Sequence, residues 1–277
     1  MSELITEIAI VGAGNLGRRH LQSLVQLKSP RNFYIIDPFE KSLLEAENLV
    51  RANDKNAIHK YNFAKEIDHL PGQIDFAVLA TSSNERFTAL SQFLNKRKVR
   101  FLLIEKVLFP RLGEYNAARD LLLKNGVTAW VNCPRRMYPL FQEMRNYFLD
   151  SGPTIFSATG NMWQLGCNGI HAYDAFAFLT GDTDIQFKTD LLDQKVLSSK
   201  RSGYIEFTGS IYGGSNKGNF IQMTSNANHV ARMPAVYSIA NANAHFIVQG
   251  GAEAHYQYAL AKDNWEWKRK PIKYPFQ

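Results

Sequence analysis

Two short stretches of the sequence carry side chains that could move a proton. One is Glu105-Lys106, and the other runs from Cys167 to Asp174 with a histidine, His171, inside it. His171 and Asp174 are three residues apart, so on a helix they share a face, and the carboxylate could orient the imidazole and set its tautomer. These residue types predict general acid–base chemistry, with Lys106, His171 and Asp174 as the candidate catalytic residues.

Each stretch also has a purely structural interpretation. Lys106 alone could be a solvated lysine after a strand, and a lone histidine before a helical stripe of aromatic residues is more often part of a core. Three further residues could contact a substrate, and each has a packing or salt-bridge alternative: Arg136, Trp163 and Asn168.

A glycine-rich turn near the start of the chain has the spacing of a phosphate cradle. After a short apolar run the chain reads Gly12-Ala-Gly14-Asn15-Leu16-Gly17, and a helical pattern follows. Gly12 allows the tight turn, Gly14 lets the backbone approach a pyrophosphate, and Gly17 lets the helix pack closely on the strand. The N–H groups and the dipole at the helix start favour the phosphate charge. The turn therefore predicts a dinucleotide-binding unit.

An acidic residue indicates which dinucleotide would bind. Asp37 lies twenty residues beyond Gly17, at the end of the second predicted strand. A carboxylate there can hydrogen-bond the adenosine ribose hydroxyls and would repel a 2′-phosphate, which favours NAD over NADP. The alternative is an aspartate that only starts a turn before Pro38. Arg18 and Arg19 are near enough to the turn to keep NADP open.

Polar residues follow two neighbouring predicted strands, where ligands bind in open α/β sheets. Thr81, Ser82 and Ser83 come after one strand and could line the cofactor, although Ser83 or Asn84 could instead cap the next helix. Lys106 ends the next strand; beside a cationic nicotinamide ring and partly desolvated, its pKa would fall, and it could act as acid or base. The predicted cofactor contacts are Gly12, Gly14, Asn15, Leu16, Gly17, Asp37, Thr81, Ser82, Ser83, Glu105 and Lys106.

Alternating strand and helix patterns must position these residues in the first half of the chain. The predicted strands are Ile5–Val11, Asn32–Asp37, Ala57–Tyr61, Ile74–Ala80, Arg100–Glu105 and Val127–Asn132. The predicted helices are Leu16–Gln26, Lys41–Arg51, Arg86–Asn95 and Gly113–Lys124. Repeated units of this length imply a doubly wound parallel sheet with helices on both faces, so we predict an α/β Rossmann domain at residues 1–132.

The pattern changes to mostly strands after residue 132. The predicted strands are Ile155–Met162, Ile185–Leu192, Tyr204–Tyr212, Asn219–Ser225, Ala235–Ile239 and His245–Gln249. The predicted helices are Tyr138–Leu149 and Gly169–Leu179. We therefore predict an α+β domain over residues 133–277, with a mostly antiparallel open sheet.

Size and composition narrow the class of protein. A chain of 277 residues suits two packed units, and its net charge of +7 favours anionic ligands, while the scattered basic residues argue against nucleic acid. The two cysteines are too few for a disulfide scaffold and lack the paired spacing of a metal site. No apolar run approaches the ~20 residues of a membrane helix, and the N-terminus has no signal-peptide pattern. These features predict a cytoplasmic enzyme without a metal.

Taken together, the motifs resemble those of the Gfo/Idh/MocA family of nicotinamide-dependent oxidoreductases. Glu105-Lys106 is similar to the family's Glu-Lys-Pro, the run 132–136 follows the last Rossmann strand, and the run 169–174 is similar to its Gly-x-x-His-x-x-Asp element. The resemblance implies a second domain whose large open sheet often forms a homo-oligomer interface. It also implies an active site between the domains, with Lys106 and His171 as acid–base residues beside the nicotinamide and a sugar-like substrate.

Two positions depart from the family pattern. Val107 replaces the usual proline, so we expect a trans peptide bond between Lys106 and Val107. Cys167 stands four residues before the histidine, where many members have an aspartate that relays a proton. A Cys-Asn-x-x-His variant is similar to relatives in bacterial surface-sugar pathways. The sequence thus predicts an NAD(P)-dependent oxidoreductase acting on a sugar or nucleotide-sugar; the alternative is a non-catalytic, NAD-bound sensor or regulatory protein on the same scaffold.

Overall fold

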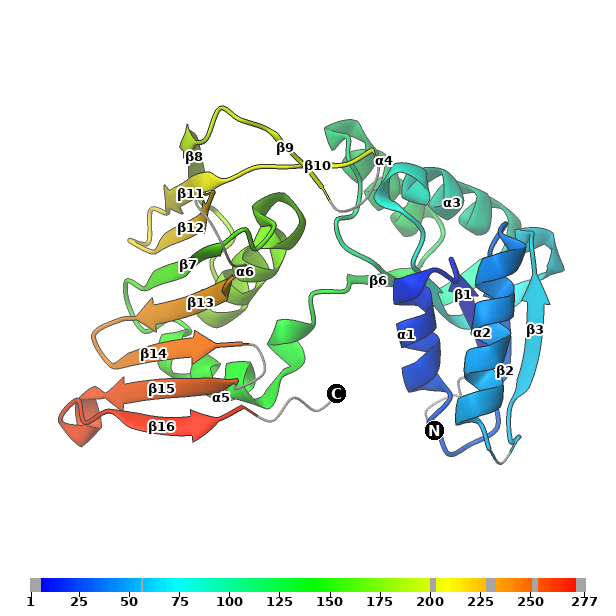
Figure 1. The fold of residues 1–277 in the computed structure, drawn as a ribbon, viewed down its shortest axis with the longest axis horizontal. Coiled ribbons are helices and arrows are strands. Elements are labelled where there is room, and N and C mark those ends of the chain that lie inside the picture. The colour runs from blue at the N-terminus through cyan, green and yellow to red at the C-terminus, as the bar shows by residue number, and fades with distance from the viewer. Residues whose placement is uncertain (1–5, 56, 200–202, 228–232, 251–253, 273–277) are drawn as a thin grey trace. The chain divides into compact units, whose positions relative to one another are not determined.

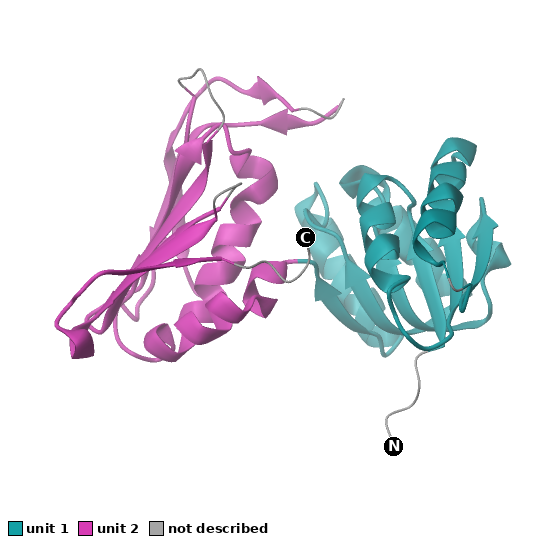
Figure 2. Ribbon diagram, turned by 60° about the horizontal axis from the view of Figure 1, so that its bottom comes forward, with its two compact units in different colours: residues 1–132 teal, residues 133–277 magenta. Residues whose placement is uncertain are grey.

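The chain forms two compact units, Met1–Asn132 and Cys133–Gln277 (Figure 2). The computed structural model describes residues 6–55, 57–199, 203–227, 233–250 and 254–272. Within these ranges no helix is both long enough and apolar enough to cross a membrane.

The first unit contains a parallel six-stranded sheet in the order β3-β2-β1-β4-β5-β6 (Figure 1). Its strands are β1 (Glu7–Val11), β2 (Asn32–Ile36), β3 (Lys60–Ala64), β4 (Gln73–Leu79), β5 (Lys98–Ile104) and β6 (Thr128–Val131). Its helices are α1 (Asn15–Leu24), α2 (Glu40–Asn53), α3 (Ser83–Lys96) and α4 (Leu112–Lys124). The central strands are almost continuously apolar, as strands covered on both faces must be. The predicted Rossmann sheet is confirmed.

The core of this unit lies in two layers, one on each face of the sheet. Leu21 of α1 and Leu43 of α2 pack in one cluster, and Phe93 of α3 and Ala118 of α4 pack in the other. Because every crossover between adjacent parallel strands is a helix, the carboxyl ends of the strands and the loops after them meet at one edge. Gly12, Asp37, Thr81 and Lys106 all stand in such loops.

The third strand begins later than predicted. The sequence pattern placed it at Ala57–Tyr61, and the structure has β3 at Lys60–Ala64. The carboxylate of Asp54 accepts the N–H groups of Ile58 and His59 at 3.4 and 3.3 Å, which holds this segment in a turn. Ile5, the predicted start of the first strand, lies outside the described residues.

The second unit is built on an eight-stranded sheet in the order β16-β15-β14-β13-β7-β12-β11-β8 (Figure 1). Its strands are β7 (Ile155–Asn161), β8 (Gln186–Leu192), β11 (Gly209–Gly214), β12 (Phe220–Asn226), β13 (Met233–Ala240), β14 (Ala244–Gln249), β15 (His255–Leu260) and β16 (Lys268–Pro271). Neighbours are antiparallel except for the β7–β12 pair. The prediction of a mostly antiparallel sheet is confirmed, although its strands β15 and β16 were missed.

Two helices, α5 (Pro139–Phe148) and α6 (Leu165–Thr180), cover one face of this sheet (Figure 2). Phe148 of α5 and Phe176 of α6 are fully buried against Phe156 and Phe246 of the sheet. Helix α6 starts four residues before its predicted start. The predicted strand Tyr204–Tyr212 is divided, because only β10 (Ile205–Glu206) and β11 are extended; β10 pairs with β9 (Leu197–Ser198) as a separate ribbon.

Candidate cofactor and substrate sites

The glycine-rich turn between β1 and α1 is packed at two glycines and open at the third. A Cβ on Gly17 would lie 1.8 Å from the carbonyl oxygen of Gly12, and one on Gly12, whose φ is +97°, would lie 2.7 Å from the amide of Thr81. A Cβ on Gly14 would meet nothing within 4 Å. The N–H groups in the first turn of the helix have no carbonyl acceptor within the helix. The space in front of them is open on the side from which a phosphate would approach.

A groove of about 520 Å³ adjoins this turn. Its walls include Val11, Gly12, Ile36, Pro38 and Thr81, from the ends of three parallel strands. The turn and the groove have the size and the donors that a dinucleotide needs, so the residues fit NAD or NADP.

Asp37 ties the end of β2 to the glycine-rich turn. Its buried carboxylate accepts the N–H of Ala13 at 2.7 Å through Oδ2 and the N–H of Phe39 at 2.9 Å through Oδ1. The second contact is the turn before Pro38 that the sequence offered as an alternative. The contact with a ribose stays a prediction.

Arg18, one of the two residues that kept NADP open, is engaged within the first unit. Its guanidinium donates to the carbonyl of Ala13 at 3.0 Å and to Oδ1 of Asn15 at 2.8 Å. It also pairs with Glu45 of α2 at 2.7 Å. These contacts hold the guanidinium against the turn itself.

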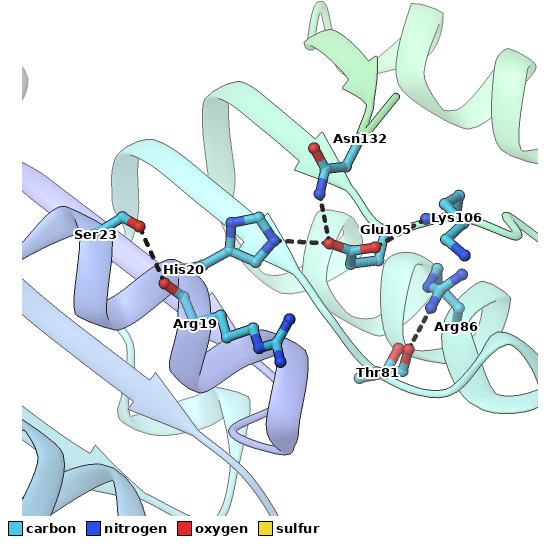
Figure 3. A network of polar contacts seen from close by, with 8 residues as sticks. All are labelled: Arg19, His20, Ser23, Thr81, Arg86, Glu105, Lys106 and Asn132. Carbon is cyan, nitrogen blue, oxygen red and sulfur yellow. Dashed lines mark hydrogen bonds and ion pairs between the residues drawn. The ribbon is translucent and has the colours of Figure 1, made fainter. Parts of the chain in front are cut away.

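Arg86 of α3 connects the loops that follow β4 and β5. The residue is 2% exposed, and its guanidinium donates to the carbonyl of Thr81 (Figure 3). It also donates to the carbonyl of Val107 and, at 3.1 Å, to that of Leu108. Ser82 occupies the N-cap position of the helix without a side-chain capping bond, and Ser83 begins the helix. Arg86 thus fixes the backbone of both loops that carry predicted cofactor contacts, the one after β4 and the one after β5.

The peptide bond between Lys106 and Val107 is cis. The expectation of a trans bond, which rested on the absence of proline, is wrong. Proline statistics describe the intrinsic preference of a bond, whereas here Arg86 binds the carbonyl of Val107 and the next one along the chain. The residue type at a single position does not reveal such tertiary contacts.

Glu105 is the centre of a buried polar network at this edge (Figure 3). Its Oε1 lies 2.7 Å from Nε2 of His20 and accepts from Nδ2 of Asn132 at 2.6 Å, and its Oε2 accepts the N–H of Lys106 at 3.2 Å. Burial by itself would raise the pKa of this carboxyl. The hydrogen bonds from His20 and Asn132 and the nearby positive charges outweigh that effect, so its pKa lies below the ordinary value.

In the second unit, helix α6 carries His171 and Asp174, and Glu206 of β10 holds the start of that helix. The two carboxylate oxygens of Glu206 accept the N–H groups of Gly166 and Cys167 at 2.9 and 3.2 Å. A carboxylate is favourable at a helix N-terminus because of the unpaired N–H groups and the dipole. Cys167 stands one turn before His171 on this helix.

Asp174 binds an arginine and does not hold the imidazole as predicted. Its two oxygens accept from Nε of Arg136 at 3.0 Å and from Nη2 of the same guanidinium. The local spacing on the helix suggested His171 as the partner, but the short 3₁₀ helix Pro134–Met137 brings the arginine to the carboxylate. The fork of a guanidinium matches a carboxylate better than an imidazole does.

A cavity of about 340 Å³ in the second unit brings together three of the predicted substrate residues. Trp163, Asn168 and His171 line it, and the arginine that lines it is Arg135 rather than Arg136. Trp163 is fixed by its own indole N–H, which donates to the carbonyl of Thr224 at 2.8 Å. The Asn168 amide donates to the carbonyl of Trp163 at 2.8 Å. Among the described residues no cluster of three histidine, cysteine or acidic side chains could hold a metal ion.

Residues 6–133, almost the whole of the first unit, match the sequence model of the family described as an oxidoreductase family with an NAD-binding Rossmann fold. This match confirms, for the first unit, the resemblance to the Gfo/Idh/MocA family. A comparison of the sequence with curated proteins finds no match.

Solved structures with the fold of both units include enzymes and a regulator. UDP-N-acetylglucosamine 3-dehydrogenase from Acidithiobacillus ferrooxidans has a TM-score of 0.69 at 14% identity, over 98% of this chain and 84% of that one. An oxidoreductase from Agrobacterium radiobacter in complex with NAD⁺, L-tartaric acid and magnesium has 0.70 at 13%, over 96% and 79%. The transcriptional regulator Gal80p from Kluyveromyces lactis has 0.71 at 12%, over 96% and 78%. At these identities the likeness shows the fold alone.

Four residues that hold the predicted motifs in place have no predicted role: His20, Arg86, Asn132 and Glu206. One signal was available for His20, which lies three residues after Gly17 on the same helix and hence faces the sheet edge. No local pattern marks the others, because their partners, apart from Thr81 for Arg86, are 21 to 40 residues away in the chain.

Proposed function

We propose that this chain is an NAD(P)-dependent oxidoreductase that transfers a hydride between the nicotinamide and a hydroxyl or keto group of a sugar or nucleotide-sugar. The observation that carries the proposal is the sheet edge of the first unit. There the Gfo/Idh/MocA domain combines a glycine-rich turn open at Gly14 with a lysine, Lys106, whose backbone is fixed by buried contacts.

The cofactor, when bound, supplies the carbon that accepts or donates the hydride. The N–H groups of Asn15 and Leu16 bind its diphosphate, Asp37 binds the adenosine ribose, and Thr81, Ser82 and Ser83 line its path along the edge. NAD is favoured over NADP because a 2′-phosphate would meet the carboxylate of Asp37, while Arg18 is already paired with Glu45.

Proton transfer falls to residues of this chain. A carbinol that loses a hydride becomes a protonated carbonyl unless its hydroxyl proton also leaves, so a base must take that proton. Each unit offers one candidate, Nζ of Lys106 and the imidazole of His171. Glu105 positions the lysine through its backbone N–H, and Trp163 and Asn168 line the same cavity as the imidazole.

A sugar suits the cavity of the second unit. A volume of about 340 Å³ is at the small end of ligand pockets, and the walls combine flat aromatic rings with a few polar groups. The dehydrogenase from Acidithiobacillus ferrooxidans, which shares this fold, is named for a UDP-sugar.

Turnover tests the proposal directly. The purified protein is incubated with NAD or NADP and a panel of sugars and nucleotide-sugars, and absorbance of the reduced cofactor is followed. Lys106→Ala and His171→Ala should each lower kcat by about 10²- to 10⁴-fold, the usual contribution of a general acid or base. Lys124→Ala, an exposed lysine at the end of α4, is the control and should leave kcat unchanged. Turnover that survives in the Lys106→Ala/His171→Ala protein would refute the mechanism.

Cofactor choice has a separate test. Asp37→Ala should weaken binding of NAD more than binding of NADP. NAD loses a hydrogen-bond acceptor for its ribose, whereas for NADP that loss is offset because the carboxylate no longer repels the 2′-phosphate. An equal effect on both cofactors contradicts the ribose contact.

A regulatory protein is the second candidate, favoured by the shared fold of Gal80p, a transcriptional regulator. This alternative predicts that the protein binds NAD or NADP but turns over no sugar in the panel. Calorimetry with each cofactor, followed by the same absorbance assay, separates the two functions.

A further inference from the structure

The cavity of the second unit has an unusual balance of charge. Rings of Tyr138, Trp163 and Tyr237 form much of its wall, and its polar groups include Asn168 and His171. Arg135 is its one formally charged residue, and no aspartate or glutamate lines it within the described part of the chain. A ligand in this cavity therefore meets a positive charge that no described residue of the wall neutralises.

Arg135 and Arg136 are adjacent in sequence but have different partners. The guanidinium of Arg136 is bound to both oxygens of Asp174. The guanidinium of Arg135 lies over the ring of Tyr237, with 5.3 Å between its central carbon and the ring centre, and the residue is half-buried. Across the residues that the structure describes, no carboxylate lies within ion-pair distance of Arg135, so its attraction to the ring leaves its N–H groups for a ligand.

We propose that Arg135 binds an anionic group of the substrate, so that the protein selects acidic sugars over neutral ones. The group is a carboxylate or a phosphate, since the planar fork of a guanidinium donates two parallel hydrogen bonds to either. The contact with the Tyr237 ring restricts the movement of the guanidinium, which lowers the entropy lost when an anion binds. This inference rests on the proposed function only in taking the cavity as the substrate's site.

The same geometry disfavours two other kinds of sugar. A neutral sugar would cover the half-buried charge without offering it a counter-ion, and an amino-sugar would bring a second positive charge close to it. Specificity here would come as much from these penalties as from the attraction of the acid.

Binding without cofactor tests the inference independently of turnover. Ligand-observed NMR titrations compare four probes that share one ring size: D-glucuronate, D-glucose 6-phosphate, D-glucose and D-glucosamine. At low salt at least one acid should bind ten or more times tighter than glucose, and glucosamine should bind no better than glucose. Added salt should weaken binding of the acid and leave glucose unchanged. Which of the two acids binds tighter identifies the anionic group as carboxylate or phosphate.

Arg135→Met removes the charge but keeps an unbranched side chain against Tyr237, and it should abolish the preference for the acid. Arg135→Lys retains the charge without the planar fork, and it should keep part of the preference for the acid. A partial preference in this variant shows that the loss in Arg135→Met does not come from a folding defect. Arg51→Met, at an exposed arginine of α2, is the control and should behave as the parent. The inference is overturned if neither acid binds better than glucose, if no probe binds at all, or if Arg135→Met retains the preference. An acid that binds through Arg135 but is never oxidised would instead count against the proposed function.

Discussion

Two acidic side chains of the predicted sites, Glu105 in the first unit and Asp174 in the second, are held in opposite ways. In the first unit Glu105 is 2 % exposed and is fixed by His20, Asn132 and a backbone N–H (Figure 3). In the second unit Asp174 is bound by Arg136, whose side chain is 44% exposed. Glu105 is part of a buried network, whereas Asp174, whose side chain is 15% exposed, forms a pair that is partly exposed.

This difference indicates how each unit builds its site. A buried carboxylate must have all its partners in place, so the network around Glu105 fixes the backbone that leads into Lys106. A partly exposed pair contributes little and tolerates movement, so the site of the second unit depends more on its cavity wall than on this pair. We therefore expect substitutions at the two acids to differ in their effect on stability.

The largest effect is expected for Glu105→Ala. It leaves His20 and Asn132 without their common acceptor in a buried place, and removal of one partner of a buried pair costs about 3–5 kcal/mol. The free energy of unfolding, measured in urea for the full chain, should fall by that amount. Glu47→Ala is the matched control, because it removes an exposed helix pair with Arg51. If both variants lose the same small amount, the network around Glu105 is not stabilising.

A slightly smaller effect is expected at the glycine-rich turn. Gly17→Ala places a methyl group 1.8 Å from the Gly12 carbonyl, so the backbone must shift, at a cost of about 2–3 kcal/mol. Gly14→Ala is its control for folding, since that methyl group meets nothing within 4 Å. Thermal unfolding should separate the two variants, whereas calorimetry with NAD should show weakened binding in both. Equal unfolding temperatures would contradict the packing assigned to Gly17.

The sequence was sufficient for features that depend on local pattern. Apolar runs such as Ile8–Val11 revealed the central strands, and the spacing of Gly12, Gly14 and Gly17 revealed the turn. The strand β15 alternates polar and aromatic residues, which is a strand signal that was overlooked. The strand β16 has no large apolar side chain and is exposed along its length, so no apolar pattern marks it.

Partner choice between distant segments could not be read from the chain. A helix places Asp174 beside His171 by local geometry, whereas Arg136 reaches the carboxylate only through the tertiary fold. In the same way, Arg86 binds carbonyls 21 and 22 residues ahead of it. Local patterns therefore predicted which side chains could act as acids, bases or ligand contacts. They left open which of these side chains are already bound to distant residues of the chain.

A pH dependence is expected from the lowered pKa of Glu105. Because its folded pKa lies below the unfolded value, the unfolded state takes up a proton first as the pH falls. The stabilisation is thus complete above the unfolded pKa of about 4.3 and is lost as the pH falls through the folded pKa. Glu105→Gln should lose less stability than the parent between about pH 5 and the folded pKa. Parallel curves for the two proteins would show that Glu105 keeps an ordinary pKa.

The smallest effect on stability is expected for Asp174→Asn. The pair with Arg136 is partly exposed, so its loss should lower the free energy of unfolding by less than about 1 kcal/mol. A double-mutant cycle with Arg136→Met should give a coupling energy of the same size. The catalytic readout is the more decisive one, because a carboxylate that orients a catalytic imidazole typically contributes 10-fold or more to the rate. We expect Asp174→Asn to leave the pH profile of kcat unchanged, since its partner is the arginine; a loss as large as that of His171→Ala would restore Asp174 as the residue that positions the histidine.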